Sequence, residues 1–423
     1  MAIFFLLFTL IGLSEGQQFL PFSDFTTSFD VELKNVEIGM KLYVSCISSN
    51  TEQLQNYVFT SGKETKTGYE LVQSYQDQAS GLKAPWVLPA AQVTVSNRDN
   101  TAVSNMAGFV YILSAEQSKD PSFYVYDVFG TQTIDRSSDQ NSTIVMLPRM
   151  TLVDFGFKDY AATLTNFNMR AGSAIQIYRD YPSANLSANL GNKVFANPMD
   201  HVDLGTMFFY NVDPLQISYP AFHIVASGGI YFQAHNSFTS STLPKNATST
   251  TVTGLIMNRI FTANSTIYYQ PDHRYNGYTG YKSTLRNVLA PVVVQLNEFG
   301  SYVWNENFTS DSSYEGFDTQ TLADAMYVWP MNMNSGFYSF QYYQIQTTPK
   351  VMTTMHVVTA NDGSTTVPTK AMPNSTISAI PTVKPTQTPL PTTPQVIPTT
   401  TKLTSFPSIF LASIVVLMAT NLS

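Results

Sequence analysis

Cysteine is nearly absent from this chain of 423 residues, which contains Cys46 alone. One cysteine cannot form a disulfide within the chain, whereas extracellular proteins commonly pair theirs. Stability must therefore come from packed hydrophobic cores, for which the chain is long enough. Cys46 alternates with Met40, Leu42 and Val44. We therefore expect a buried thiol that packs as a small hydrophobe, rather than a reactive or intermolecular one.

Charge is also scarce. Charged residues make up 12% of the chain, about half the usual fraction, while aromatic residues reach 13%. This composition favours extracellular β-structure over a helical or disordered chain. The formal net charge is −7 and no basic stripe occurs in the sequence. Because phosphate binding requires clustered cations, nucleic acid is not expected as a partner.

Catalytic and metal-binding motifs are missing from the sequence. The G-x-S-x-G match at residues 12–16 directly follows an apolar run and lacks the strand-turn-helix context of a nucleophile elbow. No P-loop, HExxH or EF-hand pattern occurs, so neither a metal nor a cofactor is expected. His223, in Ala-Phe-His-Ile-Val, is interpreted as a core residue. Glycosidase carboxylate pairs are conceivable, but solvated loop acids are the simpler interpretation. These pairs are Glu298 with Glu306 and Glu315 with Asp318.

Long apolar runs lie at the two ends. Residues 1–16, MAIFFLLFTLIGLSEG, fit a cleaved secretory signal, although no Lys or Arg precedes the apolar run. Residues 406–423 begin with FPSIFLASIVVLMA, which is shorter than the ~20 residues of a membrane-spanning helix. No basic residue follows it. This pattern predicts a GPI-attachment signal, and hence an extracellular protein held at the plasma membrane by a lipid. A secreted protein is the alternative.

Ser, Thr and Pro dominate the segment before this tail. They form over half of the residues from about Ser364 to Ser405, which contain no acidic or aromatic residue. We assign residues 351–405 to a disordered stalk because this composition cannot form a core. Sequons of the form N-x-[ST] independently predict an extracellular glycoprotein and surface positions for their asparagines. They are Asn141, Asn185, Asn246, Asn264, Asn307 and Asn374.

Between residues 19 and 350 the hydrophobic pattern is that of strands. Short β-branched or aromatic segments are bounded by turn residues, and long helical stripes are absent. Examples are residues 29–33, 174–178, 291–296 and 336–346. The pattern predicts an all-β fold of tandem antiparallel β-sandwich modules, CUB-like or jelly-roll in arrangement. We place these modules at residues 17–145, 146–245 and 246–350.

One segment is a candidate binding site. Residues 268–281, YYQPDHRYNGYTGY, combine turn formers with tyrosines and a small polar cluster. Rigid aromatic area beside adaptable Gly and Asn is the chemistry of recognition loops, on which a sugar ring or a protein can stack. The alternative is a hairpin whose aromatic rings pack on a neighbouring module. The candidate ligand-binding residues are Tyr268, Asp272, His273, Arg274, Tyr275, Tyr278 and Tyr281.

Two short motifs resemble those of CUB domains. Gly39-Met-Lys-Leu42 opens one strand, and Asn105-Met-Ala-Gly-Phe-Val-Tyr111 opens a later one, with an echo at Asn334-Ser-Gly-Phe-Tyr. Together with the signal, stalk and tail, they make the chain similar to the nematode CUB-like surface proteins. The chain lacks the disulfides and calcium-binding acids of many CUB domains, so no metal site is carried over. The resemblance implies an extracellular interaction role in responses to microbes, without enzymatic activity.

The combined prediction is an extracellular, GPI-anchored glycoprotein that acts as a non-enzymatic binding module. Its partner would be an extracellular protein or glycan, and its role would lie in surface defence or in the response to microbes. Two alternatives stay open. One is a secreted or anchored, glycan-directed hydrolase that uses Asp/Glu pairs. The other is a structural surface-coat glycoprotein whose function is its glycosylated bulk.

Overall fold

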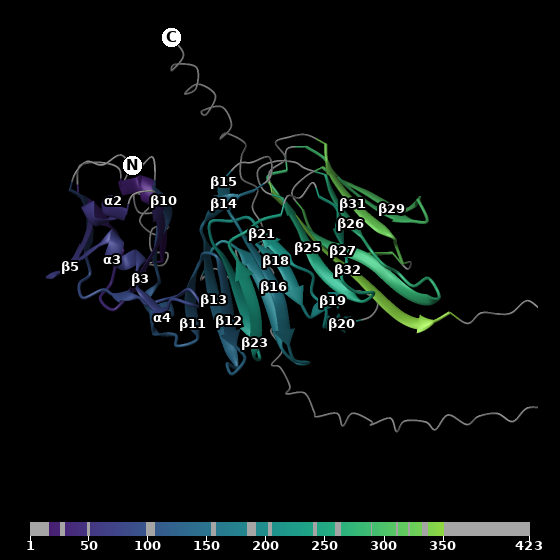
Figure 1. Cartoon of the computed structure of the whole chain (residues 1–423), viewed down its shortest axis with the longest axis horizontal. Coiled ribbons are helices and arrows are strands. Elements are labelled where there is room, and N and C mark those ends of the chain that lie inside the picture. Colours follow the sequence, from purple (N-terminus) through teal and green to yellow (C-terminus); the bar gives the residue numbers. More distant parts are fainter. Residues whose placement is uncertain are drawn as a thin grey trace, which may run out of the picture. The chain divides into compact units, whose positions relative to one another are not determined.

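Short segments rich in Val, Ile, Tyr and Phe fold as strands because branched and aromatic side chains pack well on a pleated surface. The computed structural model of the chain is drawn in Figure 1. It describes residues 17–25, 30–48, 51–98, 106–153, 158–183, 192–201, 205–239, 243–258, 264–288, 290–309, 312–319, 322–331 and 337–350. All of these described residues belong to one compact unit. The predicted signal, stalk and tail lie outside the described residues.

Two four-stranded sheets enclose the first core. Their strand orders are β1-β10-β3-β8 and β2-β9-β4-β5. The strands are β1 (Gln18–Pro21), β2 (Val31–Leu33), β3 (Lys41–Ser48), β4 (Tyr57–Ser61), β5 (Glu64–Thr67), β8 (Trp86–Val87), β9 (Val93–Asn97) and β10 (Met106–Ile112). Short helices accompany them: η1 (Phe22–Phe25), α2 (Thr51–Asn56) and α3 (Gly68–Val72). Met40, Leu42, Val44 and Cys46 all belong to this core, as their alternation predicts.

The second core lies between a seven-stranded sheet, β18-β17-β22-β13-β11-β7-β6, and a four-stranded sheet, β12-β23-β16-β21. The first of these contains β6 (Tyr75–Asp77), β7 (Leu82–Lys83), β11 (Phe123–Val128), β13 (Asn141–Pro148), β17 (Ala174–Arg179), β18 (Lys193–Asn197) and β22 (Phe222–Ser227). The other contains β12 (Thr131–Arg136), β16 (Ala162–Met169), β21 (Leu215–Ile217) and β23 (Ile230–His235). The module boundary placed at residue 145 falls inside β13.

The third core lies between sheets β25-β32-β27-β30 and β24-β26-β31-β28-β29. The first sheet contains β25 (Val252–Asn258), β27 (Tyr275–Arg286), β30 (Ser312–Thr319) and β32 (Phe337–Pro349). The second contains β24 (Lys245–Asn246), β26 (Ser265–Tyr268), β28 (Val292–Glu298), β29 (Ser301–Phe308) and β31 (Ala325–Pro330). The remaining elements are α4 (Ala115–Lys119), β14 (Met150–Leu152), β15 (Lys158–Tyr160), β19 (Met199–His201) and β20 (Gly205–Met207).

Several strands are buried on both faces, which joins the three cores. The residues of β13 are mostly buried. Ile144 and Met146 enter the second core, while Val145 and Leu147 pack with Tyr43 of β3. In β32, the side-chain amide of Gln341 donates to the carbonyl of Ala196 over 2.7 Å and its oxygen accepts from the Ala196 N–H over 2.9 Å.

The structure confirms the predicted all-β class. Most strand pairs are antiparallel, and among the described strands the exceptions are β11 with β13 and β24 with β26. Each core lies between two facing sheets, as in a sandwich. The division of the chain at residues 145 and 245 stays a prediction, because strands of one sheet come from distant parts of the sequence.

Candidate ligand-binding surface

An open pocket lies where the start of β27 meets the end of β32. Its volume is about 380 Å³, and its wall combines two tyrosine rings with hydroxyl, amide and ammonium groups. The lining residues are Tyr275, Asn276, Gly277, Tyr278, Leu322, Thr347, Thr348 and Lys350. Four of them come from the segment that the sequence singled out. We call this feature the tyrosine pocket.

Backbone irregularity shapes the pocket. Tyr275 pairs with Pro349 and Gly277 with Gln346, and the register shifts between these two pairs. A Cβ atom on Gly277 would lie 2.3 Å from the carbonyl oxygen of Ile345 and 2.5 Å from Leu322. Only glycine therefore allows the two strands to approach at this point.

Hydrogen bonds hold the polar wall of the tyrosine pocket in place. The Thr347 hydroxyl donates to the carbonyl of Asn276 over 2.9 Å, and the Asn276 amide reaches the Thr348 hydroxyl at 3.4 Å. The backbone N–H of Lys350 donates to the carbonyl of Arg274 over 2.7 Å. These contacts fix the edge of the pocket before any ligand arrives.

His273 connects the loop that leads into β27 to neighbouring elements. Its Nε2 lies 2.8 Å from Asp324 Oδ1, and its Nδ1 lies 3.3 Å from Glu298 Oε1. Its ring also contacts the ring of Phe299, with 4.3 Å between the centroids. The imidazole thus links the loop to the end of β28 and to the residue before β31. These contacts give His273 a positioning role beside the tyrosine pocket.

Phe299 is a residue that sequence reasoning missed. It occupies the tip of the β28–β29 hairpin, is 74% exposed, and has φ +50°. Gly300 follows with φ +78°, and Glu298 pairs with Ser301, so the loop has the two positive φ values of a type I′ turn. Asn or Gly usually occupies the first of these positions. The Phe-Gly dipeptide between two alternating segments was the signal that could have found it.

Of the seven candidate residues, Tyr275 and Tyr278 line the tyrosine pocket. Asp272, His273, Arg274, Tyr275 and Tyr278 lie along the loop and the first residues of β27. The exposed Arg274 guanidinium lies 2.6 Å from Asp272 Oδ2. Its hydrogen bonds lower the pKa of Asp272 to about 2, so this carboxyl is ionised at neutral pH.

Two of the candidate tyrosines lie apart from the pocket. Tyr281 is 1% exposed and belongs to the third core, where its hydroxyl accepts from Trp304 Nε1 over 3.2 Å. Tyr268 is exposed on β26, away from the lining of the tyrosine pocket. Tyr281 thus packs in the core of its own pair of sheets, and not on a neighbouring module.

The two glutamates of the hydrolase alternative that the structure locates, Glu298 and Glu306, do not occupy adjacent backbone positions. Glu306 lies opposite Val294, four residues or roughly 13 Å along β28 from Glu298. A glycosidase requires a separation of about 5–10 Å. The side chains of Glu315 and Asp318 lie outside the described residues. Across the part of the chain that the structure describes, no group of three or more His, Cys, Asp or Glu could hold a metal ion.

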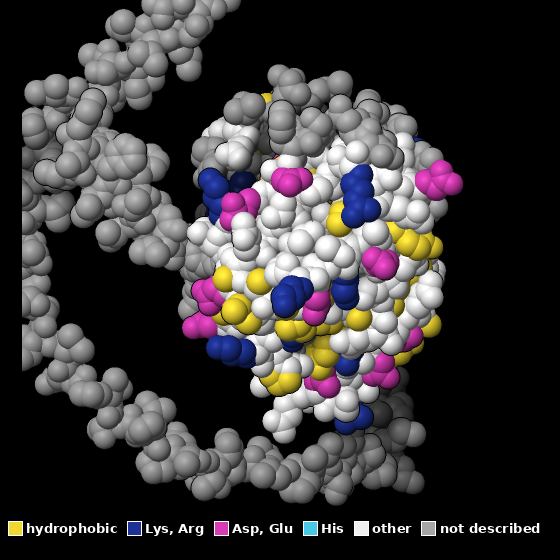
Figure 2. Space-filling view, turned by 90° about the vertical axis from the view of Figure 1, so that its left-hand side faces the viewer, with side chains coloured by type: hydrophobic (Ala, Val, Ile, Leu, Met, Phe, Trp, Pro, Cys, Tyr) yellow, Lys and Arg dark blue, Asp and Glu magenta, His cyan; other side chains and the backbone are white. Residues whose placement is uncertain are grey.

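The sequon asparagines within the described residues are all exposed, as predicted. They are Asn141, Asn246, Asn264 and Asn307. Asn185 and Asn374 lie outside those residues. Figure 2 shows Lys and Arg interspersed with Asp and Glu on the side of the molecule at the left of Figure 1. On that described surface, no stripe of one charge is visible.

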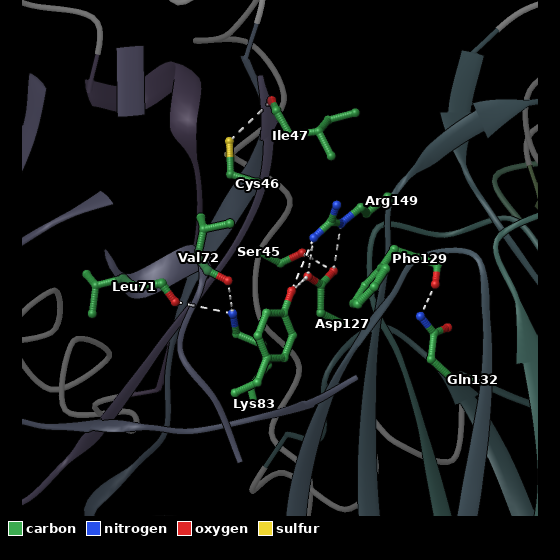
Figure 3. Close-up of polar contacts among 11 residues, drawn as sticks. Ser45, Cys46, Ile47, Leu71, Val72, Lys83, Asp127, Phe129, Gln132 and Arg149 are labelled. Carbon is green, nitrogen blue, oxygen red and sulfur yellow. Dashed lines mark hydrogen bonds and ion pairs between the residues drawn. The ribbon is translucent and has the colours of Figure 1, made fainter. Parts of the chain in front are cut away.

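A buried polar cluster lies between the first core and the seven-stranded sheet (Figure 3). Asp127 of β11 is fully buried and accepts from the Ser45 hydroxyl over 2.9 Å and the Tyr75 hydroxyl over 2.7 Å. Arg149 Nη2 lies 2.8 Å from the same carboxylate. Since Ser45 belongs to β3 and Tyr75 to β6, the cluster joins strands of two sheets.

Lys83 lies beside this cluster and is also buried. Its ammonium donates to the carbonyls of Leu71 and Val72, at the end of α3, over 3.2 and 2.6 Å. It also lies 4.2 Å from the centroid of the Tyr75 ring. Burial lowers the pKa of Lys83 to about 8. The Asp127 carboxylate and the Lys83 ammonium are thus held by protein groups, which is the arrangement of a structural joint and not of an open site.

The lone cysteine is confined to the first core. Cys46 is 3% exposed, and burial raises the pKa of its thiol to about 12. A thiol that stays protonated and covered is a poor nucleophile. The interpretation of Cys46 as a buried hydrophobe is confirmed.

The solved structures that match the chain have low sequence identity to it and low TM-scores. The CUB1-EGF-CUB2 domain of human MASP-1/3 is 7% identical with a TM-score of 0.18, and the match covers 51% of this chain and 100% of that chain. The insecticidal delta-endotoxin Cry8Ea1 from Bacillus thuringiensis is 8% identical with a TM-score of 0.17, covering 77% and 55%. A Sulfolobus turreted icosahedral virus structure is 9% identical with a TM-score of 0.17, covering 76% and 84%. At these scores the likenesses carry no argument.

A family match decides the classification. Residues 37–418 match a family described as transmembrane glycoprotein. The chain belongs to this transmembrane glycoprotein family. Membership agrees with the glycoprotein that the sequons predict and with a place at the cell surface. No curated protein matches the chain.

The family also qualifies two predictions. The resemblance to CUB domains is weak, and nothing among the matches supports the nematode group. The family name describes a transmembrane protein, so the lipid anchor stays a prediction. Among the described residues, no helix is both long and apolar enough to cross a bilayer. The apolar run at residues 406–419 lies outside them.

Proposed function

We propose that this transmembrane glycoprotein family member is an extracellular binding protein whose tyrosine pocket holds a glycan without catalysis. The observation that carries the proposal is the pocket itself, where Tyr275 and Tyr278 stand beside hydroxyl, amide and ammonium donors. Sugars have both apolar ring faces and many hydroxyls, so they need flat aromatic area and hydrogen-bonding groups in one place.

The shape of the pocket favours the end of a glycan over a drug-sized apolar ligand. At about 380 Å³ the open volume suits one or two sugar rings. Lys350 adds a cation at the rim, which would favour an acidic sugar. The fixed Thr347 and Asn276 contacts reduce the ordering that binding would require.

Phe299 extends the proposed binding surface. A phenylalanine in the left-handed region is strained, and strain of this kind collects at functional sites. Its exposed ring is held against His273, which belongs to the loop leading into the pocket. We include Phe299 as a second aromatic contact for a longer glycan.

The experiment displays the full chain on animal cells and stains them with fluorescent, multivalent glycans, including acidic and neutral oligosaccharides. Tyr278→Ala should lower the apparent affinity of the bound glycan by tenfold or more, or ~1.4 kcal/mol. Tyr210→Ala is the matched control because Tyr210 is 73% exposed and does not line the pocket. Surface expression of each variant checks that it folds.

Four other outcomes would each contradict the proposal in a different way. Glycan binding that survives Tyr278→Ala would place the ligand elsewhere. If no glycan binds but a purified surface protein does, the partner is a protein. Cleavage of the glycan, lost in Glu298→Gln, would favour a hydrolase. Tolerance of substitutions throughout residues 268–281 would favour a surface coat.

We further propose that residues 1–16 direct secretion and that the tail at 406–423 is removed and replaced by a GPI lipid, which holds the protein at the plasma membrane through the stalk. The shortness of the apolar run in that tail supports a lipid, whereas the family name favours a spanning segment. Phosphatidylinositol-specific phospholipase C should release the displayed chain. Retention beside a released GPI-anchored standard would favour a span, and appearance in the medium without enzyme would indicate secretion.

The weak CUB-like resemblance would connect this binding to surface defence or to responses to microbes. Microbial surface glycans are acidic and neutral polysaccharides, so they belong in the stained panel. A chain that binds host glycans alone would remove this part of the proposal.

A further inference from the structure

The outward face of the β24-β26-β31-β28-β29 sheet has an aromatic cluster. Residues paired directly across neighbouring strands point to the same face. Val292, Val294 and Leu296 of β28 point into the third core, so the alternate residues point outward. The outward row through Val293 contains Trp329 on one side and Asn307 on the other. The rows beside it contain Tyr327, Gln295 and Asn305, and then Tyr268, Ala325, Asn297 and Tyr302.

These aromatic side chains are partly open to solvent. Tyr302 is 68% exposed and Tyr268 is 42% exposed. The rings of Tyr327 and Trp329 lie 5.8 Å apart between centroids and are half-buried. A contiguous exposed apolar patch usually marks a surface that contacts another molecule or group. We call this surface the aromatic face.

Three sequon asparagines surround the aromatic face. Asn307 shares the row of Val293 and Trp329. Asn246 is aligned with Tyr268 in the parallel pair of β24 and β26. Asn264 precedes Ser265, whose partner is Val328, so the same register extended by one residue brings Asn264 opposite Trp329. Sugars attached to these asparagines would therefore extend from the aromatic face.

We propose that the N-linked glycan of Asn307 folds back over the aromatic face and stacks its first N-acetylglucosamine rings on Val293 and Trp329. Asn307 and Trp329 are separated by β28 alone, which is two strand spacings or about 9.5 Å. The asparagine side chain and one or two sugar rings can span this distance. The apolar ring face would cover the indole, while Asn305 and Gln295 lie in the next row to meet the acetamide and hydroxyl groups.

The positions of the sequons favour the chain's own glycan over a protein partner. A protein docked flat on the aromatic face would have to displace sugars attached on both edge strands and at the start of β26. An attached sugar, by contrast, is present at a high effective concentration and loses little freedom when it stacks. The inference is independent of the tyrosine pocket, whose lining residues lie on β27 and β32 and at Leu322 and Lys350.

The experiment compares glycosylated full-length proteins from animal cells. Thr309→Ala removes the sequon but keeps Asn307, and Asn141→Gln removes a sequon on β13 as the matched control. Tryptophan emission reports on Trp329, because Trp86 is buried and Trp304 packs against the third core. Thr309→Ala should shift the emission to the red and raise acrylamide quenching, whereas Asn141→Gln should change neither. Adding Trp329→Phe should abolish the difference.

A second measurement avoids any folding defect of Thr309→Ala. Peptide N-glycosidase applied to the folded wild-type protein should release the Asn307 glycan more slowly than the Asn141 glycan, as followed by mass spectrometry. Trp329→Ala should bring the two rates together. An unoccupied Asn307, unchanged quenching in Thr309→Ala, or equal release rates in the wild type would each overturn the proposal.

Discussion

At the scale of single residues, the burial of His223 makes the stability of the fold depend on pH. It is 1% exposed, as expected for a core residue, and stacks on Tyr178 with ring planes 7° apart. Its Nδ1 lies 2.8 Å from the carbonyl of Asp180. Burial lowers the pKa of His223 to about 4, despite the opposing effect of that hydrogen bond. The imidazole is therefore neutral in the folded protein at neutral pH.

The prediction is a loss of stability in acid. Between pH 6.5 and 4 the unfolded chain binds a proton at His223 that the folded chain does not, so stability falls as the pH falls through this window. The largest possible loss is about 3 kcal/mol. His223→Asn cannot titrate but can still donate to the Asp180 carbonyl. Urea unfolding at pH 7 and 4.5 should show a smaller acid loss in this variant.

A comparison of the two proteins above pH 7 is the control for this prediction. Between pH 7 and 8, above the window of His223, the difference in stability between wild type and His223→Asn should stay constant. If both proteins lose the same stability between pH 7 and 4.5, His223 does not carry the effect.

Some single-residue properties could be predicted from the sequence, and others could not. Alternation was enough to bury Cys46, because period 2 fixes which side chains share a face. It was not enough to separate Tyr278 at the pocket from Tyr281 in the core, since this depends on which face of β27 meets a second sheet. The positive φ of Phe299 depends on a two-residue loop, which the Phe-Gly dipeptide suggests and the pairing of Glu298 with Ser301 establishes.

At the scale of elements, the β28–β29 hairpin combines a strained tip with an exposed ring. A non-glycine residue in the left-handed region costs roughly 1–2 kcal/mol, while asparagine tolerates it. Because the Phe299 ring is largely exposed, little burial is lost with it. Phe299→Asn should therefore raise the melting temperature slightly, although it removes the contact with His273. Thermal unfolding followed by circular dichroism measures the change.

Gly300 supplies the matched control for this hairpin. It has φ +78°, and a Cβ atom at this position would meet nothing within 4 Å. Gly300→Ala therefore tests backbone strain alone and should lower the melting temperature. A fall in Phe299→Asn would mean that the ring contact outweighs the strain. A rise together with weaker glycan staining would identify Phe299 as a residue kept for binding at a cost in stability.

The type of most elements could be predicted, but not which of them pair. The short alternating segments are strands, as their period indicates. The hairpin of β6 and β7, from residues 75–83, nevertheless joins the sheet of β11 and β13. Pairing between distant segments depends on complementary faces that no local pattern records. The double-sided burial of β13 also removes the alternation that would mark a module edge.

At the scale of the whole molecule, the described cores are coupled through strands that are buried on both faces. Tyr43 and Tyr111 of the first pair of sheets pack with Val125 and Val145 of the seven-stranded sheet. The buried carboxylate of Asp127 adds a polar joint to this apolar contact. A joint of this kind should determine whether the sandwiches unfold together or separately.

The last prediction tests that joint. Asp127→Asn leaves Arg149 without its buried counter-ion and should destabilise the fold by ~3–5 kcal/mol. Ser45→Ala removes one hydrogen bond to the same carboxylate and should cost only ~1 kcal/mol. Asp135→Asn, on the exposed side of β12, is the charge-matched control and should change little. In urea, Asp127→Asn should also separate one cooperative transition into two, because the first pair of sheets loses its polar link to the second. A single transition, or equal losses in Asp127→Asn and Ser45→Ala, would mean that the apolar contact of Tyr43 and Tyr111 couples the cores without the cluster.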